Sequence, residues 1–259
     1  GMPLIYLPFD VSVAALGFNN AKDLNMNFKR SFWGDEFLTN TKTFNVFAQA
    51  NYKISDEWTS QSVFSSTSNR ASGLQTWFYL YPNEVISRNA WDANGKDNAI
   101  EFQQNFNGDF LLFGKMRNRF LIGGDLFHST NRLGYRLLPN GELDRIQYTG
   151  AAPTYNNFNP TTVNAELVNG FDYKTNSSLS TYSAYVADAI NITESLIVSA
   201  AVRFDHYDNQ GTTDDTTGQK AGDFSQNAFS PKFGIVYQVI KDQVSVFGNY
   251  QNSFTNIGY

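Results

Sequence analysis

The most constraining feature of the sequence is an alternation of apolar and polar residues with a period of two. Between residues 44 and 54 the apolar positions are Phe44, Val46, Ala48, Ala50, Tyr52 and Ile54. A β-strand places successive side chains on opposite faces, so this segment has one apolar face and one face made mostly of amides and charge. Ser55-Asp56-Glu57 ends the run, and Trp58 begins another. The segment therefore predicts a β-hairpin.

The same alternation recurs along the chain and predicts about ten antiparallel strands. We expect them near residues 4–17, 23–33, 42–54, 58–68, 98–112, 117–131, 178–190, 195–207, 227–240 and 243–254. No stretch competes convincingly as a helix. The fold class indicated is all-β.

The connections between these strands alternate in length. Short turns near residues 19, 56, 115, 193 and 242 alternate with longer polar loops at 34–41, 69–97, 132–177 and 208–226. Short turns on one rim and long loops on the other are typical of an outer-membrane barrel whose short turns face the periplasm. The expected strands are also long enough for the roughly 9 to 11 tilted residues that cross a bilayer. The pattern favours an antiparallel up-and-down transmembrane β-barrel.

Composition excludes several classes of function. The chain has no Cys and only 2 His, which removes disulfides, thiol catalysis and Cys-based zinc sites and leaves little for a Ser-His-Asp relay. A net charge of −5 argues against a nucleic-acid partner. Charged residues make up 17% of the chain, below the roughly 25% of ordinary soluble domains, and aromatic residues make up 16%. We expect no catalytic residues, no metal site and no cofactor.

A soluble β-protein shows the same period, because its apolar face turns toward a core. Two features favour the membrane: the strand lengths, and the aromatic residues Tyr52, Trp58 and Tyr237 beside short turns, where an interfacial girdle would lie. The polar second face suits a wet lumen and a solvated sheet equally well. The pattern alone leaves both interpretations open.

Two consecutive segments carry a resemblance to a known family. Residues 180–211, STYSAYVADAINITESLIVSAAVRFDHYDNQG, resemble the Y-x-x-Y-x-Q-D … L-x-x-x-x-G-x-R-Y-D hairpin of TonB-dependent outer-membrane receptors, in particular their siderophore-receptor branch. Residues 228–255 are similar to the next hairpin of that family through Ser-Pro-Lys-Phe-Gly and Tyr-Gln-Asn-Ser-Phe-Thr. Ala187 stands where Gln is usual, and Ala201 where Gly is frequent.

The resemblance implies a barrel of about 22 strands around a plug domain, in the outer membrane of a bacterium. It implies active uptake of ferric siderophores or similar nutrients, driven through TonB. On this interpretation residues 1–259 are part of the barrel domain, truncated at both ends, with about 10 of the expected 22 strands and neither plug nor TonB box. The expected partners are a ferric siderophore, TonB through the plug region, and outer-membrane lipid.

Candidate ligand-binding residues lie in two of the expected extracellular loops. They are Trp77, Phe78, Tyr79 and Tyr81 in the loop 69–97, and Tyr135, Arg136, Arg145 and Tyr148 around an expected hairpin at Pro139-Asn140-Gly141. Aromatic faces and guanidinium groups suit bulky, polar and sometimes anionic iron complexes. The alternative is that these rings only pack one loop against another.

Other polar groups favour structural roles. His128 and His206 fall at the outer ends of strands, and residues 92–97 resemble a calcium loop whose ligand series breaks off, so we expect a polar turn there. Asp214-Asp215 suggests a solvated acidic turn.

Two alternative functions remain at this point. The first is a ten-stranded outer-membrane protease of the omptin type, for which His206 beside Asp205 and Asp208 is the only hint. The second is a soluble β-sandwich or adhesin-like binding module, which would fit the mean hydropathy of −0.38.

Overall fold

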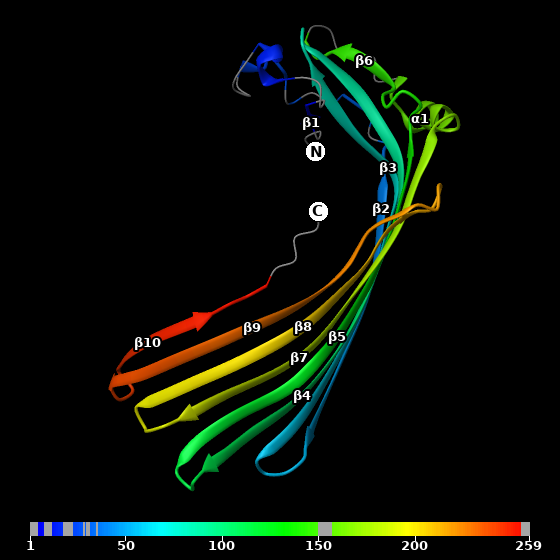
Figure 1. Cartoon of the computed structure of the whole chain (residues 1–259). Coiled ribbons are helices and arrows are strands. Elements are labelled where there is room, and N and C mark those ends of the chain that lie inside the picture. The colour runs from blue at the N-terminus through cyan, green and yellow to red at the C-terminus, as the bar shows by residue number, and fades with distance from the viewer. Residues whose placement is uncertain are drawn as a thin grey trace.

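The chain forms one tall, curved antiparallel sheet (Figure 1). The computed structural model describes residues 5–7, 12–17, 23–27, 29, 32–34, 36–149 and 157–254. In chain order the elements are β1 (Ile5–Tyr6), the 3-10 helix η1 (Val13–Leu16), β2 (Thr39–Lys53), β3 (Trp58–Tyr81), β4 (Val85–Leu112), β5 (Met116–Leu137), β6 (Asp144–Gln147), α1 (Pro160–Leu167), β7 (Phe171–Asn191), β8 (Leu196–Asp214), β9 (Lys220–Ile240) and β10 (Val244–Gln251).

Eight of the strands build the wall of the sheet. Their order is β2-β3-β4-β5-β7-β8-β9-β10, and each pairs with the next in antiparallel orientation. Two short strands extend the ten-stranded sheet near the top: β1 pairs in parallel with β3, and β6 pairs with β4. The sheet is open, so the expected all-β, partial up-and-down barrel is confirmed.

The short turns lie together at one rim, which is at the bottom of Figure 1. They occupy residues 54–57, 113–115, 192–195 and 241–243, close to four of the expected positions. In the second of these turns Phe113 and Gly114 have φ angles of 52° and 73°, as the twist-compatible turns of tight hairpins require. The turn expected near residue 19 falls outside the described residues.

Of the strand expected at 4–17, Ile5–Tyr6 are confirmed and residues 12–17 are wrong, while residues 4 and 8–11 fall outside the described residues. Residues 13–16 form a 3-10 turn because local caps favour it: the side chain of Ser12 accepts a hydrogen bond from Ala15 N at 3.2 Å, and Gly17 adopts a φ of 77°. The strand expected at 23–33 is also wrong, since the described residues of that range contain none.

The other eight predicted strands are present, and all except β10 extend further upward than expected. The range 69–97 is mostly a continuation of β3 and β4, paired from Trp58 with Gly108 to Tyr81 with Val85. Likewise 208–226 is the upper β8–β9 hairpin. The residues expected to form a turn at 92–97 therefore lie within a strand.

Residues 132–177 hold two elements that the period-two pattern does not reveal. Helix α1 begins where the side chain of Asn159 accepts a hydrogen bond from Thr162 N at 3.0 Å, with Pro160 at the first helical position. Strand β6 pairs with β4, not with β5, so the hairpin expected around Pro139-Asn140-Gly141 is wrong as a strand pair. No described helix is long and apolar enough to cross a membrane.

The hydrophobic core lies at the top of the molecule, not in the wall. It comprises Met26, Phe32, Phe78, Leu80, Ile86, Ala90, Leu138, Tyr148, Phe158, Val163 and Leu167, with partly buried neighbours that include Trp33 and Phe37. These residues come from the described parts of 24–37, the upper ends of β3 and β4, the segment 138–148 and α1 with Phe158. We call this assembly the cap. In the part of the chain that the structure describes, the wall has no comparable cluster.

Candidate functional site

The two faces of the wall differ in chemistry. Directly paired residues share a face, and one cross-strand row reads Ala48, Phe64, Phe102, Leu126 and Tyr182. The adjacent row, on the opposite face, reads Gln49, Val63, Gln103, Asp125 and Ser183. An apolar lipid-facing side and a polar lumen-facing side are what an outer-membrane barrel requires. We call the first the outer face and the second the inner face.

Arg203 of β8 organises the middle of the inner face. Its Nη1 and Nη2 donate to the two carboxylate oxygens of Asp125 on β5, at 2.8 and 3.1 Å. Its Nη2 also donates to Ser183 Oγ at 2.7 Å, and its Nε donates to Asp205 Oδ1 at 2.8 Å. One guanidinium therefore links three adjacent strands through charge-assisted hydrogen bonds.

Tyr185 extends this network across the inner face. Its hydroxyl donates to Asn105 Oδ1 at 2.6 Å and accepts a hydrogen bond from Gln103 Nε2 at 2.8 Å. The ring can cross β5 because Gly123 lies beneath it: a Cβ on Gly123 would come within 2.8 Å of the ring and 2.4 Å of Asn105 Oδ1. The Arg203 guanidinium carbon lies 5.3 Å from the centre of the Tyr185 ring.

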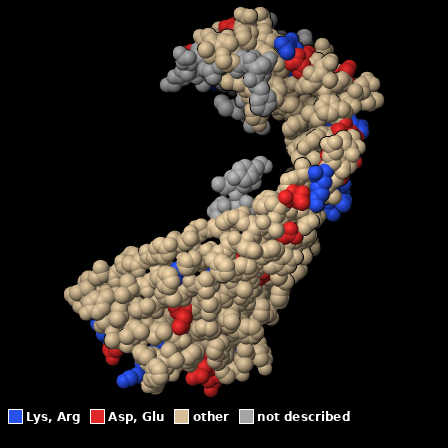
Figure 2. Space-filling model, in the orientation of Figure 1, with Lys and Arg blue, Asp and Glu red and all other residues tan. Residues whose placement is uncertain are grey.

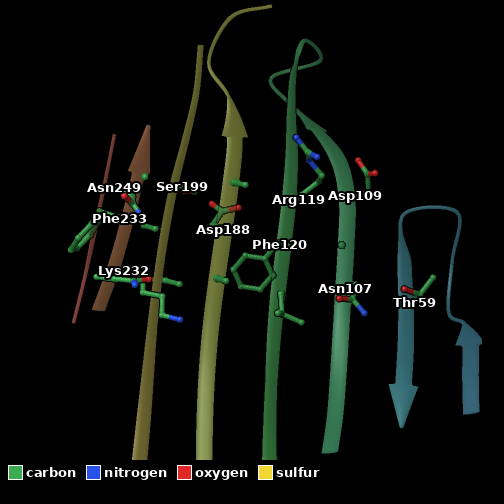
Figure 3. A pocket seen from close by; sticks show the side chains of 18 of the residues that line it. Thr59, Asn107, Asp109, Arg119, Phe120, Asp188, Ser199, Lys232, Phe233 and Asn249 are labelled. Atoms are coloured by element: carbon green, nitrogen blue, oxygen red, sulfur yellow. The ribbon is translucent and has the colours of Figure 1, made fainter. Parts of the chain in front are cut away.

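A groove of about 660 Å³ crosses the wall near the short-turn rim (Figure 3). The groove runs from β3 to β10, and its polar lining residues include Thr59, Asn107, Asp109, Arg119, Ser199 and Lys232. The lining carries both cations, such as Arg119 and Lys232, and carboxylates, such as Asp109 and Asp188. Arg119 donates a hydrogen bond to Asn191 Oδ1 at 3.1 Å. Such a mixed surface suits water and polar groups better than an apolar ligand.

A stripe of aromatic rings lies on the inner side of the upper sheet, above the polar wall. The ring centres of Tyr79 and Trp77 are 6.4 Å apart, those of Trp77 and Trp91 are 4.5 Å apart, and those of Trp91 and Tyr135 are 4.3 Å apart. The indole N–H of Trp91 donates to Gln75 Oε1 at 2.8 Å, which fixes its orientation. We call Trp77, Tyr79, Trp91 and Tyr135 the aromatic stripe. Trp77 is itself buried, so the half-buried rings of Tyr79, Trp91 and Tyr135 are the members that can offer π faces to a large ligand.

Three of the predicted ligand-binding residues belong to the stripe: Trp77, Tyr79 and Tyr135. Trp91 was not predicted, although it could have been found: once 69–97 is paired as a hairpin, the odd-numbered positions of β3 and β4 share one face. Tyr81 and Arg145 lie near the end of the same face, with the Arg145 guanidinium 4.0 Å from the centre of the Tyr81 ring. Arg145 is also paired with Glu142.

The remaining predicted residues lie elsewhere. Phe78 is fully buried in the cap, where it packs against Phe32 and Trp33. Tyr148 is also buried in the cap, and this burial, together with the nearby Glu84, raises the pKa of its hydroxyl. Neither side chain is available to a ligand in this structure.

Arg136 points to the outer side of the upper sheet, next to β7. Its Nε donates to Asp172 Oδ1 at 2.8 Å, and Lys174 donates to the other oxygen of that carboxylate at 2.7 Å. The hydrogen bond from Arg136, followed by the one from Lys174, holds the pKa of Asp172 well below its usual value of 3.8. Arg136 thus lies on the face opposite to the aromatic stripe and is already paired with Asp172.

The described residues contain no cluster of three or more potential metal ligands. His206 lies on the outer face against Asn227 Oδ1. Asp208 lies on the same face and accepts a hydrogen bond from Gln210 Nε2 at 2.6 Å, whereas Asp205 lies on the inner face with Arg203. Among the described residues, no hydrogen bond or ion pair joins His206 to either carboxylate. His128 contacts Ser180 Oγ on the outer face. The expected acidic turn at Asp214 is confirmed, because Asp214 Oδ1 accepts hydrogen bonds from Thr216 N and Thr217 N at 2.7 and 3.1 Å.

Comparison with protein families decides between the remaining interpretations. The family described as "TonB dependent receptor-like, beta-barrel" matches residues 6–259. The chain belongs to this family. TonB-dependent receptors are transporters of the bacterial outer membrane, and the outer membrane is where this barrel segment lies. The alternatives of an omptin-type protease and of a soluble β-sandwich are therefore wrong.

Solved structures share the fold at low sequence identity. The ferric-catecholate import receptor Fiu from E. coli K12, in its open form, is 14% identical over 88% of this chain, with a TM-score of 0.61. BauA, the ferric preacinetobactin receptor from Acinetobacter baumannii, is 15% identical over 82% of this chain, with a TM-score of 0.61. The ferripyoverdine receptor of Pseudomonas aeruginosa is 15% identical over 81%, with a TM-score of 0.59.

These structures are much longer than the present chain. The matched part covers 38% of Fiu, 30% of BauA and 26% of the ferripyoverdine receptor. The chain therefore corresponds to part of such a barrel. A comparison with curated proteins finds no match.

Proposed function

We propose that this chain is the barrel segment of an active transporter for ferric siderophores, and that its aromatic stripe forms one side of the ligand-binding vestibule. The observation that carries this proposal is the position of the stripe. It lies on the lumen side of the sheet and beyond the polar wall, where a ligand arriving from outside would meet it first.

The chemistry of the stripe suits the proposed ligand class. Ferric siderophores are bulky and polar, and many contain aromatic or anionic groups around the metal. Trp91 and Tyr135 present two adjacent rings tilted by 30°, while Arg145 adds a cation beside Tyr81 at the end of the same face. We leave Phe78, Tyr148 and Arg136 out of the proposed contact set because of their burial or pairing.

Inward movement of the ligand would follow the inner face. Below the stripe this face is lined by amides, hydroxyls and the Arg203 network, so it offers water-like partners rather than an apolar barrier. We propose that TonB supplies the energy through a plug region of the whole receptor. The ferric complex is the cargo.

The direct test is iron uptake by the full-length receptor, in an iron-limited strain that lacks its other ferric receptors. Radiolabelled iron is offered separately as a catecholate, a citrate and a hydroxamate complex. We expect uptake of at least one class, abolished when the proton gradient is dissipated. A receptor that assembles in the outer membrane but takes up none of these complexes would contradict the proposal.

Single variants then locate the site. We expect Trp91→Ala and Tyr135→Ala each to weaken binding of the transported complex by about 5- to 30-fold, as loss of a well-packed aromatic contact does. Tyr182→Ala is the matched control, because it removes an exposed aromatic ring on the outer face. Equal losses in all three variants would show that the stripe is not the contact surface.

A further inference from the structure

A row of four cations crosses the upper part of the sheet. Lys42 on β2 is paired with Arg70 on β3, Arg70 with Lys96 on β4, and Lys96 with Arg132 on β5. Directly opposite residues have Cβ atoms only about 5 Å apart. These strand pairings have no register shift, so all four side chains project from one face. We call these four residues the cation row.

The cation row lacks the compensation found elsewhere on the sheet. Within the described residues, none of its four members forms an ion pair, and all four are exposed. By contrast, Arg136 and Lys174 share Asp172 only a short distance above. The neighbouring carboxylate of Asp97 is on the opposite face and accepts a hydrogen bond from Asn131. Like charges directly opposite each other destabilise a sheet. A bound anion would offset this repulsion.

The cation row belongs to the outer face. It shares the even-numbered positions of Phe64 and Phe102, which lie in the apolar band. On each strand the nearest apolar outer-face residue below the row is two to six residues away, as with Phe44 on β2 and Ile100 on β4. At about 3.3 Å per residue this places the row roughly 7 to 20 Å beyond the apolar band along the strands. That is the level of lipid headgroups, not of the hydrocarbon core.

Neutral hydrogen-bonding groups lie directly below the cations. Ser68 Oγ donates to Asn98 Oδ1 at 2.9 Å, and Asn98 Nδ2 donates to Thr130 Oγ1 at 3.3 Å. Two surface hollows, of about 480 and 540 Å³, adjoin this region, and Lys96 and Arg132 line both; the lining of the larger hollow also includes Asp92, Asp172 and Asp215. Figure 2 shows Lys and Arg atoms together with Asp and Glu atoms along the convex edge of the molecule, whereas the broad lower surface carries few charges except near its lower rim. Cations beside hydroxyl and amide groups are well suited to phosphate.

We propose that the cation row binds the phosphate groups of lipid headgroups in the outer leaflet of the membrane. The outward direction of the row separates it from any ligand passing through the lumen. Its height above the apolar band brings it level with phosphorylated headgroups, and its unpaired charge is opposite to theirs. This site depends on the barrel lying in a membrane but not on which nutrient the receptor carries.

The test uses the full-length receptor purified in neutral detergent. Bisphosphorylated lipid A and enzymatically dephosphorylated lipid A are added in matched mixed micelles, and bound lipid is counted by native mass spectrometry. We expect retention of the bisphosphorylated form only. Equal retention of both forms would overturn the proposal, and this comparison needs no variant.

Two double variants locate the site. Lys96→Gln with Arg132→Gln removes two cations of the row, and we expect roughly 30-fold weaker binding of bisphosphorylated lipid A. Lys53→Gln with Lys115→Gln removes the same charge from the short-turn rim and should leave binding unchanged. Heat-modifiable gel mobility confirms that each variant is folded. Equal losses in the two double variants would assign the effect to net charge and contradict a defined site.

A competition with inorganic phosphate distinguishes a site for lipid headgroup phosphate from a site for free phosphate. We expect millimolar phosphate to leave the lipid bound, because a headgroup held in the membrane engages several cations at once. Complete displacement at millimolar phosphate would identify the row as a site for a soluble anion and overturn the lipid assignment.

Discussion

The cap and the wall of this molecule are stabilised in different ways. The cap buries aromatic and aliphatic side chains from four segments around Phe78, as a small soluble domain does. The wall has two accessible faces, and its outer face exposes residues such as Phe102 and Phe229. The wall relies on backbone hydrogen bonds and on lipid, whereas the cap relies on removing apolar surface from water. The cap is therefore stabilised against water and the wall against lipid. The same kind of substitution should change stability by different amounts in the two parts.

The largest expected effect is in the cap. Phe78→Ala leaves a cavity in a fully buried cluster and should destabilise the cap by about 3 to 5 kcal/mol. We expect faster proteolysis of residues 69–97 in the full-length receptor, with unchanged heat-modifiable mobility of the barrel. Phe224→Ala, in the upper β8–β9 hairpin and outside the cluster, is the control and should have a clearly smaller effect. Loss of barrel mobility in Phe78→Ala would mean that cap and wall unfold together.

The next effect tests the outer face of the wall. Ala48→Arg and Val198→Arg place a guanidinium against lipid, which costs about 2 to 4 kcal/mol near the bilayer midplane. Both should lower the yield of receptor assembled in the outer membrane. Gln49→Arg and Ser199→Arg, one residue further along each strand, point to the inner face and should assemble normally. Equal damage from both sets would show that inside and outside have been exchanged.

A smaller effect is expected on the inner face. Arg203→Ala strands the carboxylates of Asp125 and Asp205 on the inner face, and we expect a loss of about 1 to 3 kcal/mol in denaturant unfolding of the receptor. Arg119→Ala is the matched control because Arg119 also faces inward but makes a single side-chain hydrogen bond, to Asn191. The comparison fails if both variants unfold at the same denaturant concentration.

The smallest effect concerns pH and the outer side of the upper sheet. Arg136 and Lys174 lower the pKa of Asp172 below 3.8, so the folded state binds this proton less tightly than the unfolded state. The stabilisation is therefore present above about pH 4 and is lost as the pH falls through the lowered pKa. Proteolysis between β5 and β7 should be independent of pH from about 5 to 8 in wild type and in Asp172→Asn alike. Below about pH 4 only the wild type should become more sensitive. Exposure of these side chains keeps the effect small.

The sequence predicts the wall far better than the cap. In the wall, lipid on one face requires apolar side chains and water in the lumen on the other face allows polar ones. Successive residues of each strand therefore alternate between apolar and polar, and the strands from 42–54 onward show this alternation. Above the membrane this selection ends. Residues 85–97 of β4 carry polar or buried side chains on both faces, so period-two counting misses a strand that backbone pairing continues.

False strands arise for a related reason. Residues 5–15 alternate well in sequence, but the described residues 12–17 form a turn, because Ser12 caps the 3-10 helix and Gly17 ends it with a positive φ. The candidate site shows the same limit. Alternation could have grouped Trp77, Tyr79 and Trp91, but the burial of Phe78 and Tyr148 depends on contacts with distant segments. Such contacts are tertiary and leave no local pattern.

The unbroken pairing of β3 with β4 has an evolutionary consequence. The ladder runs without a register shift from Trp58 at the short-turn rim to Tyr81 at the tip. A single-residue insertion within it would turn every side chain above that point to the opposite side of the sheet. Trp77 would then enter the cap, and Phe78 would face the vestibule. Viable length changes in this hairpin should therefore add or remove residues in pairs, or be absorbed at the tip around Asn83.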